Sequence, residues 1–147
     1  INIPESSRTK RIVQDLSRAA TGIIIDNIQN IICRQLKSRR QIEITLALKK
    51  LLSEDSHINR RPSYYAQLLH ISPVYLNEVV KNITGTTASK YIQDEIILRA
   101  KRMLIYTTLS IKEIAFNLGF DDHTYFTRLF TQTAGLSPTT YRKKYLE

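Results

Sequence analysis

Residues that interrupt helices are scarce in this chain. Four glycines and four prolines occur among 147 residues, and tryptophan is absent. No apolar run is long enough to cross a bilayer, which excludes a membrane-spanning helix. The single cysteine, Cys33, excludes a disulfide framework within one chain and fits a reducing cytoplasm, where it would be a small buried apolar residue. We therefore expect a helical, cytoplasmic protein.

The patterns on which most enzymes depend are missing as well. His57, His70 and His123 are scattered along the sequence, and Cys33 has no neighbouring ligand at metal-binding spacing. No glycine-rich phosphate loop is present. We predict that the chain is not an enzyme and has no catalytic residues, no metal and no cofactor.

Positive charge is what the chain has in excess. Its 22 lysines and arginines give a formal net charge of +9, which indicates a polyanionic partner such as nucleic acid or an anionic membrane. Residues 1–40 hold 8 basic and 3 acidic side chains, and residues 59–147 hold 12 and 7. Each region has a net charge of +5, so charge alone does not identify the binding region.

An apolar stripe marks the first part of the chain. Apolar residues recur every three or four positions between residues 12 and 36, which predicts an amphipathic helix over 7–38 with Gly22 as a candidate break. We interpret 37–41 as a solvated connector to a second helix over 41–53. In that helix four residues should face inward: Ile44, Leu48, Leu51 and Leu52. A polar loop follows over 53–62. The predicted domains are a helical segment over 1–40 and a folded domain over 41–147.

The stripe is long and narrow, which suits packing either on the rest of the chain or on a second copy in a short coiled coil. We expect a homodimer through residues 12–36. A basic helix lying on a membrane surface is the competing interpretation of residues 7–40. Its charges gather at the two ends and its isoleucine stripe suits a protein partner better, so we expect no membrane binding.

Helix start and stop signals become regular after residue 62. Ser72 precedes Pro73, and Ser137 precedes Pro138, in each case as an N-cap followed by a first-turn proline. A long helix is predicted over 87–106. The remaining signals are Gly85, Gly119 and Gly135 as helix ends, a capping box of Ser110 with Glu113, and Asp121 or Asp122 as a cap. No useful stretch alternates with a period of two, which predicts an all-α fold.

The second half of the sequence repeats itself. Ala66, Ile71, Leu76, Val80, Gly85 and Tyr91 have counterparts in Ala115, Phe120, Phe126, Phe130, Gly135 and Tyr141. The second copy has one extra residue near its turn. Each copy is a helix, a tight turn and a helix, with His70 in the place that Gly119 takes in the second copy. This arrangement predicts two helix-turn-helix units joined by the long helix.

The second helix of each unit should bury one face and offer the other to a DNA major groove. The predicted buried residues are Leu76, Val79 and Val80 in one unit and Phe126, Leu129 and Phe130 in the other. The base-contact candidates are Val74, Tyr75, Asn77, Glu78, His123, Thr124, Thr127 and Arg128. Arginine can pair with guanine, asparagine with adenine and glutamate with the cytosine amino group, while apolar groups meet thymine methyls.

Phosphate contacts are expected beside these faces and at the flanks of the units, where helix termini direct N–H groups toward the backbone. The candidates are Arg60, Arg61, Ser72, Lys81, Lys90, Lys112, Thr131 and Arg142. The linking helix would span roughly 27 Å over 88–105 at about 1.5 Å per residue, against about 34 Å between successive major grooves. Arg99, Lys101 and Arg102 on this helix are as well explained by a solvated face.

Two other interpretations of the same pattern remain. The exposed faces could be ordinary solvated surfaces of a helical bundle. The chain could also be a protein-interaction module that docks on RNA polymerase or another regulator and has only non-specific DNA affinity. The repeated unit and the basic balance together favour sequence-specific binding to double-stranded DNA, with RNA polymerase as an additional partner.

The sequence from about 60 to 145 resembles the DNA-binding domain of the AraC/XylS family of bacterial transcription regulators. The most specific part is SIKEIAFNLGFDDHTYFTRLFTQTAGLSPTTYR, residues 110–142, which is similar to the second helix-turn-helix signature of that family. The stretch YYAQLLHISPVYLNEVVKNITGTTASKYI, residues 64–92, is similar to the first. It departs at His70, where a turn glycine is usual, and at Glu78, where many members carry a basic or neutral polar residue. The resemblance implies transcription regulation and an upstream effector-binding or dimerisation domain, with residues 7–38 as the tail of that domain.

Overall fold

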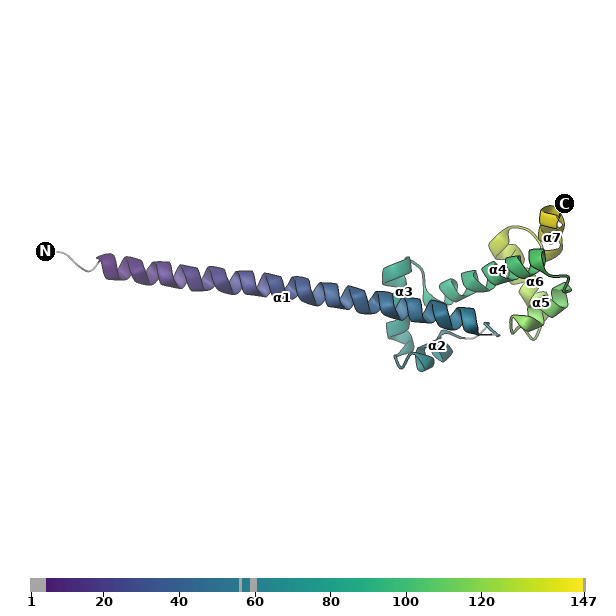
Figure 1. The fold of residues 1–147 in the computed structure, drawn as a ribbon, viewed down its shortest axis with the longest axis horizontal. Helices are drawn as coiled ribbons and strands as arrows, with labels where there is room; N and C mark the ends of the chain where they lie inside the picture. Colours follow the sequence, from purple (N-terminus) through teal and green to yellow (C-terminus); the bar gives the residue numbers. More distant parts are fainter. Residues whose placement is uncertain (1–4, 56, 59–60, 147) are drawn as a thin grey trace. The chain divides into compact units, whose positions relative to one another are not determined.

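The computed structural model describes residues 5–55, 57–58 and 61–146. These residues form seven α-helices and no strand, which confirms the predicted all-α class (Figure 1). The chain divides into two compact units, Ile1–Arg40 and Gln41–Glu147. Of the first unit the structure describes residues 5–40, which form the N-terminal part of helix α1 (Glu5–Glu54).

Helix α1 corrects the predicted interruptions of the N-terminal region. The expected break at Gly22 and the expected connector over 37–41 both lie inside this helix. A single interior glycine costs about 1 kcal/mol, which is too little to end a helix. The run of lysine, serine, arginine and glutamine contains good helix formers, and no proline or further glycine occurs before Pro62. A polar run of this kind is a solvated helix face. The expected burial of Cys33 was wrong as well, since this side chain is exposed on α1.

The second unit contains two helix-turn-helix pairs, as predicted. Helices α2 (Pro62–Leu68) and α3 (Pro73–Thr84) form the first pair, and α5 (Ile111–Asn117) and α6 (His123–Ala134) form the second. Helix α4 (Ala88–Tyr106) links the pairs and lies between them in Figure 1. Helix α7 (Pro138–Leu146) follows the second pair and packs against α4 and α6.

Side-chain caps fix where most of these helices begin. The Ser72 hydroxyl accepts a hydrogen bond from the Tyr75 N–H at 3.1 Å, with Pro73 at the first helical position. Ser110 and Glu113 form the predicted capping box, in which the Ser110 N–H donates to the Glu113 carboxylate at 2.7 Å and the Glu113 N–H donates to the Ser110 hydroxyl at 3.2 Å. Each cap satisfies backbone N–H groups that a helix start leaves without partners.

The two tight turns have the same hydrogen-bond pattern. The Ile71 N–H donates to the Ala66 carbonyl at 3.0 Å, and the Phe120 N–H donates to the Ala115 carbonyl at 2.9 Å. Both are the long bond of a Schellman motif, which requires a left-handed residue just before the donor. That residue is His70 in the first turn, with φ of 54°, and Gly119 in the second, with φ of 88°.

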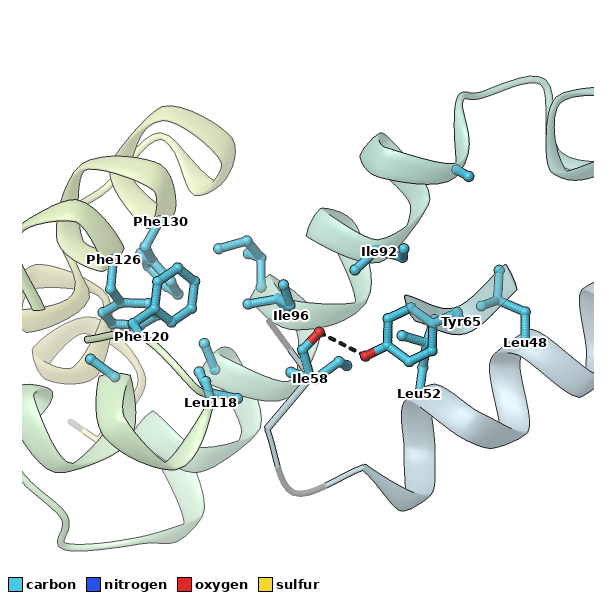
Figure 2. Close-up of a cluster of buried hydrophobic side chains, with 14 of the residues drawn as sticks. Leu48, Leu52, Ile58, Tyr65, Ile92, Ile96, Leu118, Phe120, Phe126 and Phe130 are labelled. Carbon is cyan, nitrogen blue, oxygen red and sulfur yellow. Dashed lines mark hydrogen bonds between the residues drawn. The ribbon is translucent and has the colours of Figure 1, made fainter. Parts of the chain in front are cut away.

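One hydrophobic core serves both pairs (Figure 2). Leu48, Leu52 and Tyr65 line the part next to α2, while Phe120, Phe126 and Phe130 form the part next to α6. Ile92 and Ile96 project from α4 between these groups. The Tyr65 hydroxyl donates to the Ile58 carbonyl at 2.9 Å, so the ring can be fully buried without leaving its polar group unpaired.

Two arginines beside this core donate hydrogen bonds to main-chain carbonyls at or near the ends of other helices. The Arg99 guanidinium on α4 donates to the carbonyls of Asp55, Leu52 and Ser53 at 2.5, 2.6 and 2.9 Å. The C-terminus of α1 thereby gains partners for carbonyls that the helix leaves unsatisfied. Arg142 on α7 donates in the same way to the carbonyls of Leu104 and Leu109 at 3.0 and 2.6 Å.

Candidate nucleic-acid interface

Helices α3 and α6 each bury one face and expose the other. Leu76, Val79 and Val80 on α3 are fully buried, as are Phe126 and Phe130 on α6, while Leu129 is half-buried against the core. This confirms the predicted inward positions. Because only one face of each helix packs against the core, most side chains on the opposite face are exposed to solvent.

The exposed face of α3 carries most of the first group of predicted base contacts. Val74 is 79% exposed, Glu78 is exposed and Tyr75 is half-buried. Asn77 has a structural role that the sequence did not reveal, because its Oδ1 accepts a hydrogen bond from the Ala88 N–H at 3.0 Å. That bond caps the start of α4 and occupies the oxygen that bidentate pairing with adenine requires.

The exposed face of α6 carries the second group. His123, Thr124 and Arg128 are exposed, and Thr127 is half-buried. The Thr127 hydroxyl donates to the His123 carbonyl at 2.9 Å, and the Thr131 hydroxyl donates to the Thr127 carbonyl at 2.7 Å. These bonds use the protons of both hydroxyl groups.

Arg128 also has an aromatic neighbour on the same helix. Its guanidinium carbon lies 5.4 Å from the centroid of the Tyr125 ring, within the range of a cation–π contact. An open hollow of about 180 Å³ adjoins this pair, and Asp122 and Thr124 complete its lining. The most strongly basic group on the α6 face therefore stands beside a small depression.

The N-terminus of α6 is occupied by its own cap. The Asp122 carboxylate accepts a hydrogen bond from the Thr124 N–H at 2.7 Å, and this bond holds the pKa of Asp122 below its ordinary value. The negative charge stabilises the positive end of the helix dipole. The Thr124 N–H therefore already has a partner within the protein.

The predicted phosphate contacts fall into four groups. Arg61, Ser72, Lys81, Lys112 and Thr131 are exposed. Lys90 is exposed and forms an ion pair with Asp94 on the next turn, at 2.8 Å between the Lys90 Nζ and the Asp94 Oδ1. Arg142 is half-buried, and its guanidinium donates to the two main-chain carbonyls described above. Arg60 lies outside the described residues.

Sequence reasoning missed the structural roles of Asn77, Arg99 and Arg142. Each side chain belongs to a residue type that also suits a DNA surface, and each bonds to a backbone group far away in the sequence. The partner of Asn77 is 11 residues away, and the partners of Arg99 are 44–47 residues away. No local pattern in the sequence signals such a contact.

The fold, with two helix-turn-helix pairs on one linking helix, can be compared with those of known protein families. Residues 65–144 match the family described as a helix-turn-helix domain. The chain is 32% identical over 152 residues to the uncharacterized HTH-type transcriptional regulator YfiF from Bacillus subtilis, which covers 97% of this chain and 46% of YfiF. The chain belongs to the AraC-type helix-turn-helix family of DNA-binding domains.

Solved structures agree with this assignment. The C-terminal domain of AraT, a response regulator from Geobacillus stearothermophilus, superposes with a TM-score of 0.63 and 29% identity, over 69% of this chain and 84% of that domain. The DNA-binding domain of AdpA, solved in complex with a target DNA, shares the fold with a TM-score of 0.59 and 24% identity, over 71% of this chain and 91% of that domain.

The chain covers only part of the length of these relatives. It spans about half the length of YfiF and a smaller share of the arabinose operon regulatory protein from Escherichia coli, 26% of which it covers at 34% identity. None of the helices formed by the described residues combines the length and apolar character needed to cross a bilayer.

Proposed function

We propose that this chain is the DNA-binding part of a transcription regulator and reads two major grooves on one side of the duplex with α3 and α6. The observation that carries the proposal is the pair of helix-turn-helix units on one shared core, each with its second helix exposed on the face away from that core. This is the element that such units place in the major groove.

The spacing of the two units supports simultaneous contact. Helix α4 has 19 residues, which is about 28 Å of helix at about 1.5 Å per residue. Adjacent major grooves on one face lie about 34 Å apart. The small difference is met by the position of each unit on α4 or by bending of the DNA, whose cost over a short site is a few kcal/mol.

The two faces offer different base contacts. Arg128 on α6 can donate to both acceptors of guanine, and the threonine methyls beside it can meet thymine methyls. On α3, Glu78 can accept from the cytosine amino group, and Val74 can contact a thymine methyl. We leave Asn77 and Arg142 out of the proposed interface because their polar atoms already bond within the protein.

Arg128→Ala and Lys81→Ala test the proposal as a pair. A site selected from a random pool and its single-base variants would be titrated with both proteins at several salt concentrations. Arg128→Ala should cost about 1–3 kcal/mol and relax the preference at one base position, with little change in the salt slope. Lys81→Ala should weaken every sequence alike and reduce the slope by about one unit.

The same titrations can reject the proposal. Uniform weakening of all sites by Arg128→Ala would make it a phosphate contact. Salt-dependent binding without any sequence preference in the parent chain would instead support the alternative of a module that docks on RNA polymerase or another regulator. Binding to anionic vesicles but not to duplex DNA would support the membrane alternative.

We further propose that residues 12–36 form a homodimer contact and that residues 7–38 are the tail of an upstream effector-binding or dimerisation domain. Large apolar side chains are exposed along this part of α1: Ile12, Val13, Leu16, Ile23, Ile24, Ile25, Ile28, Ile31, Ile32 and Leu36. Monomeric proteins rarely expose so many apolar side chains together. Light scattering at micromolar concentration should show a dimer for residues 1–147 and a monomer for residues 41–147. A monomer in both cases would contradict the contact.

A further inference from the structure

We propose that Tyr125 is a positioning residue that holds the Arg128 guanidinium in place for a guanine edge. The inference rests on the proposed function and adds a specificity determinant to it. Tyr125 itself need not touch DNA. Its ring restricts the arginine before the DNA arrives, so that less side-chain freedom is lost when the base contact forms.

The spacing on α6 places the two side chains together. Residues three apart in a helix are neighbours on its surface, so Tyr125 and Arg128 share one side of α6. The guanidinium carbon lies 5.4 Å from the ring centroid. A planar guanidinium over an aromatic face gains from the negative charge on that face, and its N–H groups remain available at its edge.

The Tyr125 ring is itself supported from the core. Tyr125 is 45% exposed, so part of its ring is covered by protein. Its centroid lies 6.0 Å from that of the buried Phe120, which in turn lies 5.3 Å from that of Phe126. A chain of ring contacts thus leads from the fully buried Phe126 to the exposed Arg128. A long, flexible cation on a helix surface would have no such support by itself.

The hollow beside Arg128 leaves room for a ligand next to the supported guanidinium. Asp122, Thr124, Tyr125 and Arg128 line it, with a volume of about 180 Å³. The Asp122 carboxylate in this lining already accepts the Thr124 N–H and repels a phosphate. A base edge with acceptors for the guanidinium fits this charge pattern better than the DNA backbone does.

The first helix-turn-helix unit supplies a natural control. Tyr75 and Glu78 occupy the positions on α3 that correspond to Tyr125 and Arg128 in the sequence repeat. The tyrosine is therefore present in both units, but only α6 has a cation three residues after it. Tyr75 cannot act on its neighbour by a cation–π contact, because Glu78 carries a negative charge.

The experiment compares Tyr125→Leu, which removes the ring, with Tyr125→Phe, which keeps it. Each variant is titrated against the selected site and its single-base variants, alone and combined with Arg128→Ala. Tyr125→Leu should reduce discrimination at the Arg128-dependent base about two- to fivefold, the factor that corresponds to an exposed cation–π contact. Tyr125→Phe should retain the parent discrimination, and Tyr75→Leu should leave the preference at that base unchanged.

Three outcomes would overturn the inference. Tyr125→Leu could discriminate as well as the parent, it could weaken every site equally, or it could lower discrimination just as much in the Arg128→Ala background. A parent chain without any base preference would refute the proposed function as well, so the two failures are distinguishable.

A measurement on the parent protein tests the inference even where a variant does not fold. In nuclear magnetic resonance spectra of the free protein, the Arg128 side-chain protons should show ring-current shifts that Tyr125→Phe retains. Arg128 protons with random-coil shifts in the parent chain would show that the ring does not hold the guanidinium, and would overturn the inference without any DNA measurement.

Discussion

The two helix-turn-helix units share a backbone design and differ in the side chains placed on it. Their turns close with equivalent hydrogen bonds, and α3 and α6 both have 12 residues and end at a left-handed glycine. The turn residue is His70 in one and Gly119 in the other. The comparison shows that backbone hydrogen bonding sets the shape of the unit, whereas single side chains set its strain and its surface chemistry.

Helices α3 and α6 differ in the charge of the residue near their centre. Glu78 stands on α3 where Arg128 stands on α6. The caps also differ in charge, but in the opposite direction, since the neutral hydroxyl of Ser72 caps α3 and the negative carboxylate of Asp122 caps α6. Two copies of one fold therefore offer DNA two different electrostatic surfaces.

The largest expected effect concerns the glycine in the second turn. A Cβ at Gly119 would lie 3.0 Å from the His57 Cβ and 3.3 Å from its Cα, at a φ of +88°. Gly85 and Gly135 also have positive φ, but a Cβ there would meet nothing within 4 Å. Gly119→Val should therefore lower the free energy of unfolding by more than the roughly 1–3 kcal/mol of backbone strain. Gly85→Val and Gly135→Val, the matched controls, should lose the strain alone.

Urea unfolding of the three glycine variants would measure these differences. Equal losses at all three positions would show that the contact with His57 has no energetic weight. An unchanged stability in Gly119→Val would show that this turn does not adopt the left-handed conformation in solution.

The next largest loss of stability is expected when Arg99 or Arg142, each bonded to main-chain carbonyls, is replaced by alanine. Arg99→Ala leaves carbonyls at the end of α1 without partners, and Arg142→Ala does the same near the end of α4. A hydrogen bond from a charged donor contributes about 1.5–3 kcal/mol, so each variant, which loses two or three such bonds, should lose at least an amount in that range. Arg99→Ala should increase amide hydrogen exchange in α1 and α2 first, and Arg142→Ala in α5 and α7 first.

Replacement by lysine is the control for charge in both cases. Lysine keeps the positive charge but cannot present the planar donors of a guanidinium to separate carbonyls. Full stability in Arg99→Lys and Arg142→Lys would mean that charge, not the hydrogen-bond geometry, holds the helix ends.

Replacing His70 by glycine should have a smaller effect on the free energy of unfolding, and in the opposite direction, as an increase. A non-glycine residue in the left-handed region costs roughly 1–2 kcal/mol, and His70 has a φ of 54°. Glycine removes this cost but loses roughly 0.5–1 kcal/mol in backbone entropy. His70→Gly should therefore raise the free energy of unfolding by about 0.5–1 kcal/mol, measured by urea unfolding. A loss of stability would mean that the histidine side chain makes a stabilising contact.

Acid should destabilise the second helix-turn-helix pair, α5 and α6, at a higher pH than the first pair, α2 and α3. Hydrogen bonds from the Ser110 and Thr124 N–H groups lower the pKa of Glu113 and Asp122 below their ordinary values. A carboxylate with a lowered folded-state pKa contributes stability above its unfolded pKa and loses it as pH falls below about 4. The caps of α3 and α4 are the hydroxyls of Ser72 and Thr87, which do not titrate in this range.

Amide hydrogen exchange between neutral pH and pH about 3 would follow this difference, after correction for the intrinsic pH dependence of exchange. Protection at the start of α5 and α6 should fall more than protection at the start of α3. Asp122→Asn and Glu113→Gln should remove most of the difference. An equal loss of protection in both helix-turn-helix pairs would show that Asp122 and Glu113 do not determine which pair is destabilised first by acid.

Much of the helical architecture could be predicted because its signals are local. Serine, proline and glycine mark the ends of α3, and aspartate and glycine mark those of α6, so each signal lies within a few residues of the helix end. The buried positions Leu76, Phe126 and Phe130 follow from a spacing of three to four residues. The connector over 37–41 was wrong because a run of polar residues does not distinguish a loop from a solvated helix.

The sequence by itself determined the helix ends after residue 62, the inward positions of the helices and the candidate surface residues on α3 and α6, because caps and periodicity act over one or two turns. Only the tertiary structure decided which polar side chains were free to meet DNA. Asn77, Arg99 and Arg142 were taken up by backbone groups 11–47 residues away, and Arg128 came to lie beside a ring that the core supports. Helix ends leave unsatisfied carbonyls and N–H groups, and folding determines which side chains reach them.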